Sequence, residues 1–547
     1  MLSKILLLSF ILLAIFLRFY DLNWDQNYSL HPDEENIANA ARRIQFFSQL
    51  NPKFFAYGGI YIYLEKGVSD ILSTTLGPDF KPNGIFSYIV IGRFFSALFS
   101  SLSAIVIFLL AKELYNKKVA LITLFLYTLN TASIQAAHFA VTESLLILLL
   151  ITIVLISIKL YKNPIIFNYI LAGLVYGLSL ATKTSALLFI TPVVAVHLLF
   201  LIKQPKLFLT LNIRLIIFFI ASICVFMILS PYSVLDWPNF YKSMQFESSV
   251  VTGAKKVTYT LQFAYSLPYI FQIKNLFWQM GPIVILSMIG FIKLLFDCRH
   301  QRDFKLLLFL SFPLIYFLVI GPWYAKFIRY QLPLIPFLVV SASILLYQIQ
   351  NRFFKIGLIL SLVSFIVTLL WSFSFLNIYT REDSRISASN WIYQNIPKGN
   401  SIMIEYHDST LPLKIEPFKP DVYNLISIDS FNSNDSNYYA EKLTSADYIV
   451  LSSRRIYKTI ENLSQKYPLA NQYYVPNKYY RLLFTNQLGY QKVSEFNSYP
   501  SLLGFIINDD SSEETFQVFD HPNIQVFKNL QQLGKNDYAE LLKNPMY

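Results

Sequence analysis

The sequence predicts a polytopic α-helical membrane protein that ends in a soluble α/β domain. Of its 547 residues, 54% are hydrophobic and only 14% are charged, whereas a soluble globule of this size would carry about 25% charged residues. Apolar runs long enough to cross about 30 Å of hydrocarbon recur through the first two-thirds of the chain. The composition then changes sharply, and short helical and strand patterns follow.

Eleven apolar stretches are expected to cross the bilayer as helices. The first could also be a signal peptide, but it has no small-residue cleavage site and runs directly into Arg18-Phe19-Tyr20-Asp21. We therefore expect an uncleaved first helix. The predicted spans lie near residues 4–20, 85–111, 119–136, 141–158, 166–181, 185–202, 213–231, 276–296, 305–321, 330–348 and 354–377.

The basic residues predict the orientation of these helices. A cytoplasmic N-terminus places most of them in inner loops, as the positive-inside rule requires, and the opposite orientation violates the rule at nearly every loop. The net charge of +12 therefore indicates cytoplasmic loops and not a nucleic-acid surface. The predicted inner residues are Lys4, Lys112, Lys117, Lys118, Lys159, Lys162, Lys203, Lys206, Arg299, Arg302, Lys305, Arg352 and Lys355.

Three longer segments then lie outside the cell: 21–84, 232–275 and everything from about residue 380. The first is long for a connector, and its aromatic pieces, such as Lys53 to Tyr57, suit short helices in the membrane interface. We therefore expect a membrane domain over 1–378 with a functional outer loop at 21–84, and an extracytoplasmic α/β domain over 379–547. The protein is expected in the plasma membrane.

The C-terminal domain has to be stabilised by its core, because Cys224 and Cys298 cannot form a disulfide framework in it. Its patterns predict a helix and two strands, a second helix and then a hairpin. The predicted helices are Ser384–Asn395 and Arg454–Lys466, the strands are Ser401–Tyr406 and Ala446–Ser452, and the hairpin joins Thr515–Asp520 to Ile524–Phe527 through His521-Pro522-Asn523.

Ionisable residues beside apolar spans are costly and therefore suggest function. Asp33 and Glu34 follow Pro32 at the predicted start of a helix in the first outer loop. Helix capping by Asp33, with carboxylates at the positive end of the helix dipole, would explain them equally well. Glu143 enters an apolar helix behind Thr142, which could cap that helix.

Two cations are expected at the same side of the membrane. Lys183 lies in the tightest outer loop, and Arg329 opens the tenth span. Lys183 could simply extend to the interface, and Arg329 could anchor its helix there, but a guanidinium near carboxylates also suits a phosphate. Because these acids and bases come from four distant parts of the chain and share one face, a functional cluster is favoured over separate structural roles.

The cluster suits glycosyl transfer from a sugar phosphate. A carboxylate can take the proton of a hydroxyl nucleophile, while Lys and Arg stabilise a phosphate leaving group. The sequence has no phosphate-binding loop of the Walker type and no glycine-rich nucleotide fingerprint. A donor outside the cell is therefore expected to be lipid-linked.

The layout resembles that of the GT-C glycosyltransferases, in particular the bacterial and archaeal branch similar to protein O-mannosyltransferases and aminoarabinose transferases. The resemblance spans about residues 1–345, and the tail only looks like the variable C-terminal domains of such proteins. The residues that carry it are His31-Pro32-Asp33-Glu34, Gly92 to Ala97, His138 to Leu145, Ala181-Thr182-Lys183 and Arg329 to Pro336.

The resemblance implies transfer of a sugar from a polyprenyl-phosphate donor to a hydroxyl of a protein, lipid or glycan on the outer face. Asp33 matches the family's loop acid, taken as the general base, and direct attack with one base implies inversion. Glu143 falls where the family often has Asp. The other implied roles are donor-phosphate binding by Lys183, Arg329 and Tyr330, catalytic support by Glu34, substrate contact by His31 and His138, and a structural role for Arg93 near the inner half of its span.

Two questions stay open at this stage. Asp33 and Glu35 form an Asp-x-Glu pair that could hold a divalent ion as in the related oligosaccharyltransferases, although no bound cofactor is expected and no His and Cys spacing suggests zinc. A transporter or lipid flippase is the alternative function, but such proteins usually place ionisable groups near the bilayer midplane and show paired halves. A non-catalytic assembly factor is a third reading.

Overall fold

The computed structural model describes residues 2–75, 85–467 and 469–543. The chain divides into two compact units. The first, called here the membrane unit, comprises Met1–Asn23, His31–Ser249 and Pro268–Leu376. The second, called the C-terminal unit, comprises Trp24–Leu30, Val250–Leu267 and Asn377–Tyr547.

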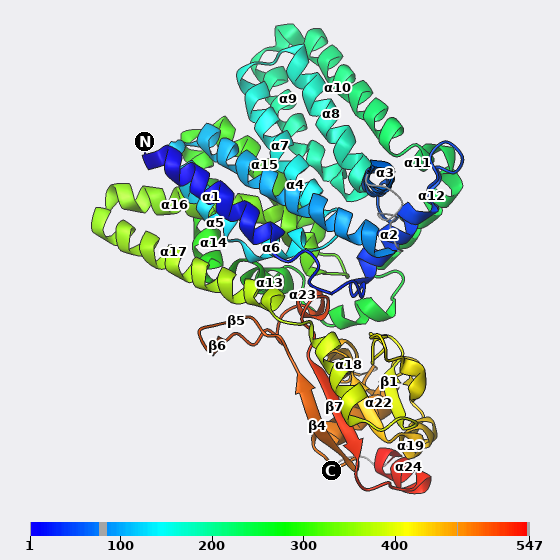
Figure 1. Cartoon of the computed structure of the whole chain (residues 1–547). Helices are drawn as coiled ribbons and strands as arrows, with labels where there is room; N and C mark the ends of the chain where they lie inside the picture. The colour runs from blue at the N-terminus through cyan, green and yellow to red at the C-terminus, as the bar shows by residue number, and fades with distance from the viewer. Residues whose placement is uncertain (1, 76–84, 468, 544–547) are drawn as a thin grey trace. The chain divides into compact units, whose positions relative to one another are not determined.

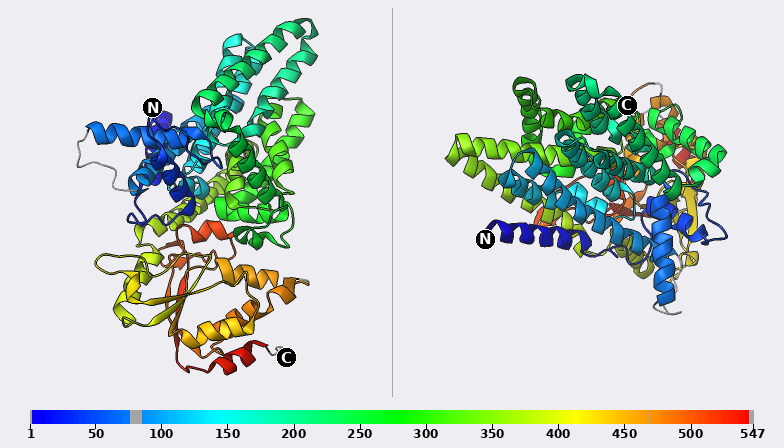
Figure 2. Two further views of the ribbon diagram at one scale, coloured as in Figure 1. Left: turned by 90° about the vertical axis from the view of Figure 1, so that its right-hand side faces the viewer. Right: turned by 90° about the horizontal axis from the view of Figure 1, so that it is seen from above.

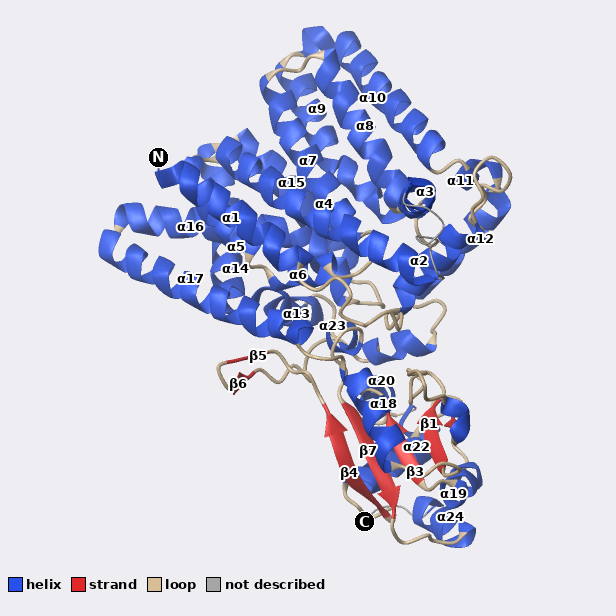
Figure 3. Ribbon diagram, viewed as in Figure 1, coloured by secondary structure: helices blue, strands red, loops and turns tan. Residues whose placement is uncertain are grey.

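Each of the eleven predicted spans coincides with apolar helix in the membrane unit (Figures 1 and 3). Among the described residues, eight helices are long and apolar enough to cross a membrane, and the bent pair α5 and α6 is a ninth candidate. The apolar helices α8 and α15 are shorter, with 17 residues each. The bounds are α1 Leu2–Phe19, α4 Ile85–Leu114, α5 Lys117–Thr128, α6 Thr131–Ala137, α7 Glu143–Lys162, α8 Ile166–Thr182, η2 Thr184–Ile190, α9 Thr191–Lys203, α10 Phe208–Leu229, α13 Ile270–Met280, α14 Val284–Gln301, α15 Phe304–Ile320, η6 Ile328–Leu334, α16 Ile335–Arg352 and α17 Phe354–Leu376.

Helices α8 and α10 lie side by side (Figures 1 and 2), and their backbones approach closely at two glycines. A side chain at Gly173 would meet the carbonyl oxygen of Phe218 at 2.5 Å, and one at Gly177 would meet that of Ser222 at 2.4 Å. Small residues four apart let membrane helices approach in this way.

The predicted fold class, a polytopic helical membrane protein with a C-terminal α/β domain, is confirmed.

The first outer loop contains two helices, α2 Pro32–Arg43 and α3 Gly59–Thr75. The expectation of helix at Lys53 to Tyr57 is wrong, because this stretch has no regular structure. Lys53 adopts a left-handed conformation with a φ of 49°, which does not fit a right-handed helix. The second outer segment contains α11 Tyr232–Leu235, α12 Trp237–Thr252 and, in the C-terminal unit, η4 Thr258–Phe263.

The C-terminal unit is built on a five-stranded sheet with the order β2-β1-β3-β7-β4. The first three strands are parallel, and β7 is antiparallel to both of its neighbours. The bounds are β1 Ser401–Glu405, β2 Asn424–Ile428, β3 Tyr448–Leu451, β4 Tyr490–Phe496 and β7 Ile524–Asn529, with helices α18 Ser384–Asn395, α19 Ser436–Ser445, α20 Arg455–Leu463, α22 Tyr474–Phe484 and α24 Lys535–Lys543.

Alternation along the strands produces two hydrophobic cores, one on each face of the sheet. Ile402 and Ile404 of β1 pack with α18, whereas Met403 between them packs with α19, α20, α22 and α24. This is the period of two that a strand buried on both faces requires. The predicted helix Ser384–Asn395 is confirmed, as are strands within both predicted strand segments and a helix within Arg454–Lys466.

The predicted hairpin around His521 is wrong. Its first half is helical, as α23 Glu514–Val518, and β7 pairs with β3 and β4 instead. A short apolar run does not distinguish a strand from a buried helical turn. Here the helical turn is stabilised by the buried Gln517, which donates to Asp509 and accepts from Arg454.

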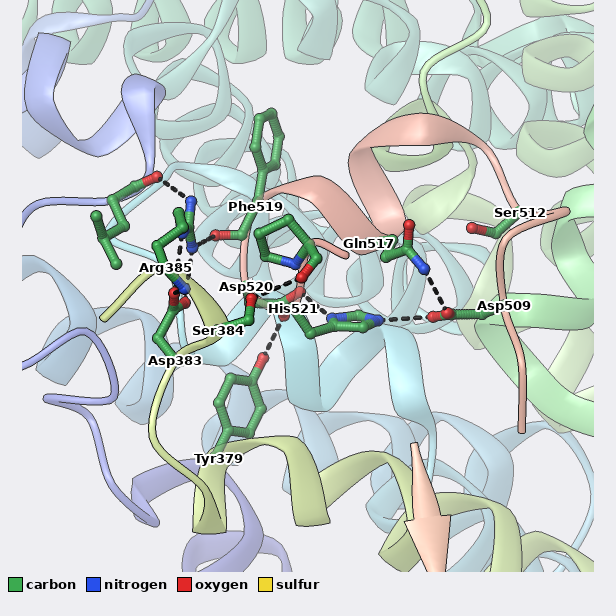
Figure 4. A network of polar contacts seen from close by, with 12 residues as sticks. Tyr379, Asp383, Ser384, Arg385, Asp509, Ser512, Gln517, Phe519, Asp520 and His521 are labelled. Carbon is green, nitrogen blue, oxygen red and sulfur yellow. Dashed lines mark hydrogen bonds and ion pairs between the residues drawn. The ribbon is translucent and has the colours of Figure 1, made fainter. Parts of the chain in front are cut away.

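A buried network of charged and polar side chains connects residues 379–385 to residues 509–521 (Figure 4). The imidazole of His521 lies between two carboxylates, 2.6 Å from Asp509 and 2.5 Å from Asp520. The hydroxyl of Tyr379 donates to Asp520 at 2.8 Å. Arg385, paired with Asp383, also donates to the carbonyl oxygen of Phe519, so the 379–385 segment is fixed to the 509–521 segment.

The contacts of His521 with Asp509 and Asp520 predict how the stability of the fold depends on pH. Burial alone would lower the pKa of the imidazole, but Asp509 and Asp520 raise the pKa to about 10 from its ordinary 6.5. The interaction therefore stabilises the fold fully below pH 6.5 and is lost as the pH rises through about 10.

We expect His521→Gln to destabilise the full-length protein by about 3–5 kcal/mol at neutral pH, because two buried carboxylates lose their counter-charge. Thermal unfolding in detergent measures this as a lowered Tm. The difference from wild type should shrink toward pH 10, where the wild-type imidazole loses its charge as well. A difference that stays constant over that range would contradict the charged assignment.

Candidate active site

The first acid of the site lies at the N-terminus of α2. Pro32 occupies the first turn, as the sequence predicted, because a proline there loses no helical hydrogen bond. The cap is His31 and not Asp33: the backbone N–H of Asp33 donates to Nδ1 of His31 at 3.2 Å. The carboxylate of Asp33 is thus not used for capping.

The Asp33 carboxylate pairs with Arg329, which is 296 positions away in the sequence. Nη1 of Arg329 donates to Oδ2 of Asp33 at 2.9 Å. The guanidinium also stacks over the ring of Phe327, 4.7 Å from its centroid. Its buried Nε has no hydrogen-bond partner among the described residues, so this group retains an N–H for a further acceptor.

A second ion pair joins Glu143 to Lys183. Nζ of Lys183 donates to Oε1 of Glu143 at 2.9 Å and lies 4.8 Å from the centroid of the Tyr57 ring. The turn that carries Lys183 is fixed by a close approach of the first outer loop: Gly58 donates to the carbonyl oxygen of Thr182 at 2.9 Å. Any side chain at Gly58 would collide with that backbone.

The two ion pairs form one electrostatic cluster. Burial alone would raise the pKa of the Asp33 carboxyl, but Arg329, His31, Lys183 and a hydrogen bond from Tyr57 lower it below the ordinary value of 3.8. Asp33 is therefore ionised at neutral pH. The structure thus brings together four predicted residues, Asp33, Glu143, Lys183 and Arg329, and all four lie where helices begin or end.

Glu34 is placed differently from Asp33. Its carboxylate is completely buried and accepts two hydrogen bonds from Arg93, at 2.8 and 2.6 Å, and one from the backbone N–H of Ala140 at 2.6 Å. These contacts fix α2 to α4 and to the turn before α7. The expectation that Arg93 lies near the inner half of its span is wrong, since Arg93 contacts the helix that carries Asp33.

The two predicted histidines are also buried. The ring nitrogens of His138 each lie 2.8 Å from a carbonyl oxygen, that of Ile134 and that of Tyr20. The ring of His31 contacts Phe139, with 4.5 Å between centroids. Tyr330 follows Arg329 and packs edge-to-face with Trp323 and Phe327.

Sequence reasoning missed Tyr57, whose ring covers Lys183, and Glu247 on α12. Burial raises the pKa of the Glu247 carboxyl, whereas Lys183 and Arg329 lower it, so Glu247 lies within electrostatic reach of the cluster. The Gly58-Gly59 pair signalled a close approach near Tyr57. A single acid on an outer amphipathic helix carries no comparable signal.

A cavity of about 720 Å³ borders this region. One wall is the irregular 53–56 segment, which is continuous with Tyr57, and the other is α12, which contacts Thr184 through Met244. Both walls therefore adjoin the turn of Lys183. The lining residues are Lys53, Phe54, Phe55, Ala56, Asp236, Asn239, Lys242, Ser243, Phe246 and Glu247.

The Asp33 and Glu35 pair does not fit a divalent ion. Residues two apart on a helix point roughly 200° away from each other, and one oxygen of Asp33 is already bonded to Arg329. Among the described residues no group of three or more His, Cys, Asp or Glu side chains is arranged to hold a metal ion.

Residues 50–245 match the model of the family described as dolichyl-phosphate-mannose-protein mannosyltransferase. This region includes Glu143 and Lys183 but not Asp33 or Arg329. A comparison with curated proteins found no match.

Solved structures of GT-C glycosyltransferases share the fold. The oligosaccharyltransferase AglB of Archaeoglobus fulgidus, in complex with an inhibitory peptide and a dolichol-phosphate, is 12% identical with a TM-score of 0.54, over 92% of this chain and 75% of that one. ArnT of Cupriavidus metallidurans, bound to undecaprenyl phosphate, is 12% identical with a TM-score of 0.50, over 96% of this chain and 98% of that one.

The predicted resemblance to the GT-C glycosyltransferases is confirmed at the level of the fold. The protein is a multi-pass membrane protein, as its apolar helices require.

The buried pair of Glu34 and Arg93 is predicted to stabilise the fold without taking part in the reaction. Arg93→Met leaves the Glu34 carboxylate buried and uncompensated, which should cost about 3–5 kcal/mol. The double variant Arg93→Met with Glu34→Leu should recover part of this loss, because no charge remains buried. Thermal unfolding in detergent measures both; equal Tm values for Arg93→Met and wild type would contradict the assignment.

Proposed function

We propose that the protein transfers a sugar from a polyprenyl-phosphate donor to an acceptor hydroxyl, with Asp33 as the general base. The observation that carries this proposal is the paired cluster of Asp33 with Arg329 and Glu143 with Lys183. The cluster combines an ionised carboxylate with two cations in one partly enclosed site. These are the groups that attack on a sugar phosphate requires.

In the proposed reaction the acceptor hydroxyl attacks the anomeric carbon of the donor. Its proton passes to the carboxylate of Asp33, a new carbon–oxygen bond forms, and the bond between the anomeric carbon and the phosphate oxygen breaks. The phosphate leaves with the electron pair of that bond and remains attached to its lipid. A single displacement of this kind inverts the anomeric configuration.

Lys183 and Arg329 would bind the donor phosphate. Arg329 has an unused Nε, and an ammonium such as that of Lys183 has three N–H groups, of which Glu143 takes one. Glu143 would hold Lys183 in place, and Tyr330 would position Arg329. Because two cations neutralise the leaving group, no metal ion is part of the proposed mechanism.

His31, His138 and Glu34 would act indirectly. His31 caps the helix that carries Asp33, Glu34 fixes that helix to α4, and His138 fixes the turn before α7. We assign these three residues to positioning and not to direct contact with substrate.

The acceptor would approach through the cavity between the 53–56 segment and α12. The cavity has lysines, carboxylates, an amide and phenyl rings, which suits a polar acceptor and not a second lipid tail. The similar structures support this donor: AglB was solved with a dolichol-phosphate and ArnT with undecaprenyl phosphate. AglB was also solved with a tethered acceptor peptide.

We place the site and the C-terminal unit on the outer side of the plasma membrane. The basic residues of the opposite helix ends support this orientation through the positive-inside rule. The alternative function, a transporter or flippase, is less well supported, because Glu143 begins α7 and Lys183 follows α8, whereas transport sites usually lie near the middle of the bilayer.

Reconstituted protein with radiolabelled polyprenyl-phosphate sugars and cell-envelope extract tests the proposed function. Asp33→Asn should lower transfer by about 10²–10⁴-fold because the base is lost, while binding of polyprenyl phosphate persists. Lys183→Met and Arg329→Gln should weaken that binding. Lys293→Met is the matched control, since Lys293 is paired with Asp297 within α14 and should leave both measurements unchanged.

Equal label transfer by wild type and Asp33→Asn would remove Asp33 as the base. Unchanged binding of polyprenyl phosphate in both cation variants would remove the proposed phosphate site. Movement of the intact labelled lipid across the bilayer, without transfer of its sugar, would favour the flippase alternative.

A further inference from the structure

The C-terminal unit carries a short hairpin whose apolar side chains are exposed among the described residues. Its strands are β5 Ser501–Leu502 and β6 Phe505–Ile506, paired antiparallel. Leu503 is 88% exposed, Phe505 80% and Ile506 67%. Burying large apolar side chains such as these releases about 1.5–3 kcal/mol each, so three adjacent exposed ones indicate an apolar surface outside the chain.

The turn of the hairpin strengthens this indication. Leu503 and Gly504 form it, and both have positive φ, at 51° and 86°. Gly adopts this conformation freely, but a leucine there costs about 1–2 kcal/mol, and Asn or Asp is the usual choice in such a turn. Since the Leu503 side chain is almost fully exposed among the described residues, a contact beyond the chain best explains an apolar residue at this strained position.

The hairpin is attached to the residues that directly follow the last membrane helix. α17 ends at Leu376, and the next residue, Asn377, donates to the carbonyl oxygen of Ser501 at 2.8 Å and to its hydroxyl at 3.1 Å. Arg381 donates to the same hydroxyl at 2.7 Å. The base of the hairpin is therefore bonded to residues that closely follow α17, the last apolar helix of the chain.

The other end of the hairpin is equally well fixed. Asp509, just beyond it, is completely buried and bonded to His521 and Gln517 (Figure 4). Asp510 accepts a hydrogen bond from Tyr499 at 2.8 Å. Both ends of the hairpin are thus bonded within the C-terminal unit, while its tip is exposed.

We infer that the hairpin 501–507 inserts its apolar tip into the membrane interface beside the last span. The lipid bilayer fits as the partner, because the hairpin is attached at Asn377, directly after the apolar helix α17, and because Leu, Phe and Ile favour the acyl boundary over water. The inserted tip gives the C-terminal unit a second contact with the membrane besides α17.

Nitroxide probes in nanodiscs test this inference on the full-length protein. Cys224 and Cys298 are first replaced by serine, and single cysteines are then introduced as Phe505→Cys, Leu503→Cys and, as control, Leu530→Cys. Leu530 is a matched control because it is 56% exposed and follows Asn529, the last residue of β7. The other end of β7 begins at Ile524, close to Pro522, whose carbonyl oxygen accepts a hydrogen bond from Ser384 near the end of α17. Collisions are measured with oxygen, which concentrates in lipid, and with a water-soluble nickel complex.

We expect the probes at 503 and 505 to collide mainly with oxygen, and the probe at 530 mainly with nickel. Two outcomes would overturn the inference. Equal access of nickel to all three sites would place the tip in water, and protection of sites 503 and 505 from both reagents would place it against protein. Because two tip positions are probed, a failure of one variant to fold leaves the test intact.

Discussion

A buried ion pair positions the helix that carries Asp33, the general base of the proposed mechanism. Glu34 on α2 and Arg93 on α4 are both inaccessible to water, and Glu34 also accepts the N–H of Ala140. A buried carboxylate is tolerated only when it is fully paired, so these contacts determine where α2 lies. Asp33 is the next residue along the backbone. Its orientation toward Arg329 therefore depends on a pair that takes no part in the proposed chemistry.

Charges are also paired in the neighbouring cluster, where Asp33 contacts Arg329 and Glu143 contacts Lys183. Two acids and two bases meet at the ends of separate helices, and each charge is compensated by another. Lys183 and Arg329 are the two cations that the proposed mechanism assigns to the donor phosphate. In the C-terminal unit, His521 and its two aspartates play a comparable structural part, joining the first residues after α17 to the segment that follows the hairpin.

Much of the membrane unit could be predicted from sequence, because a span has to satisfy its backbone within an apolar helix and so leaves a long hydropathy signal. The bias of basic residues toward the predicted inner loops then predicted one shared end of the bundle for the four residues Asp33, Glu143, Lys183 and Arg329. Pairing partners could not be predicted, since the contact of Asp33 with Arg329 joins residues 296 positions apart. The hairpin error around His521 has the same origin, because a buried polar network, and not local periodicity, makes Glu514–Val518 helical.

The most direct measurement of the central claim is an experimental structure of the protein with a polyprenyl phosphate bound. The proposed mechanism predicts phosphate oxygens about 3 Å from Nζ of Lys183 and from the guanidinium of Arg329, with the carboxylate of Asp33 facing the same space. A phosphate bound elsewhere, with both ion pairs unchanged and no path to Asp33, would contradict it.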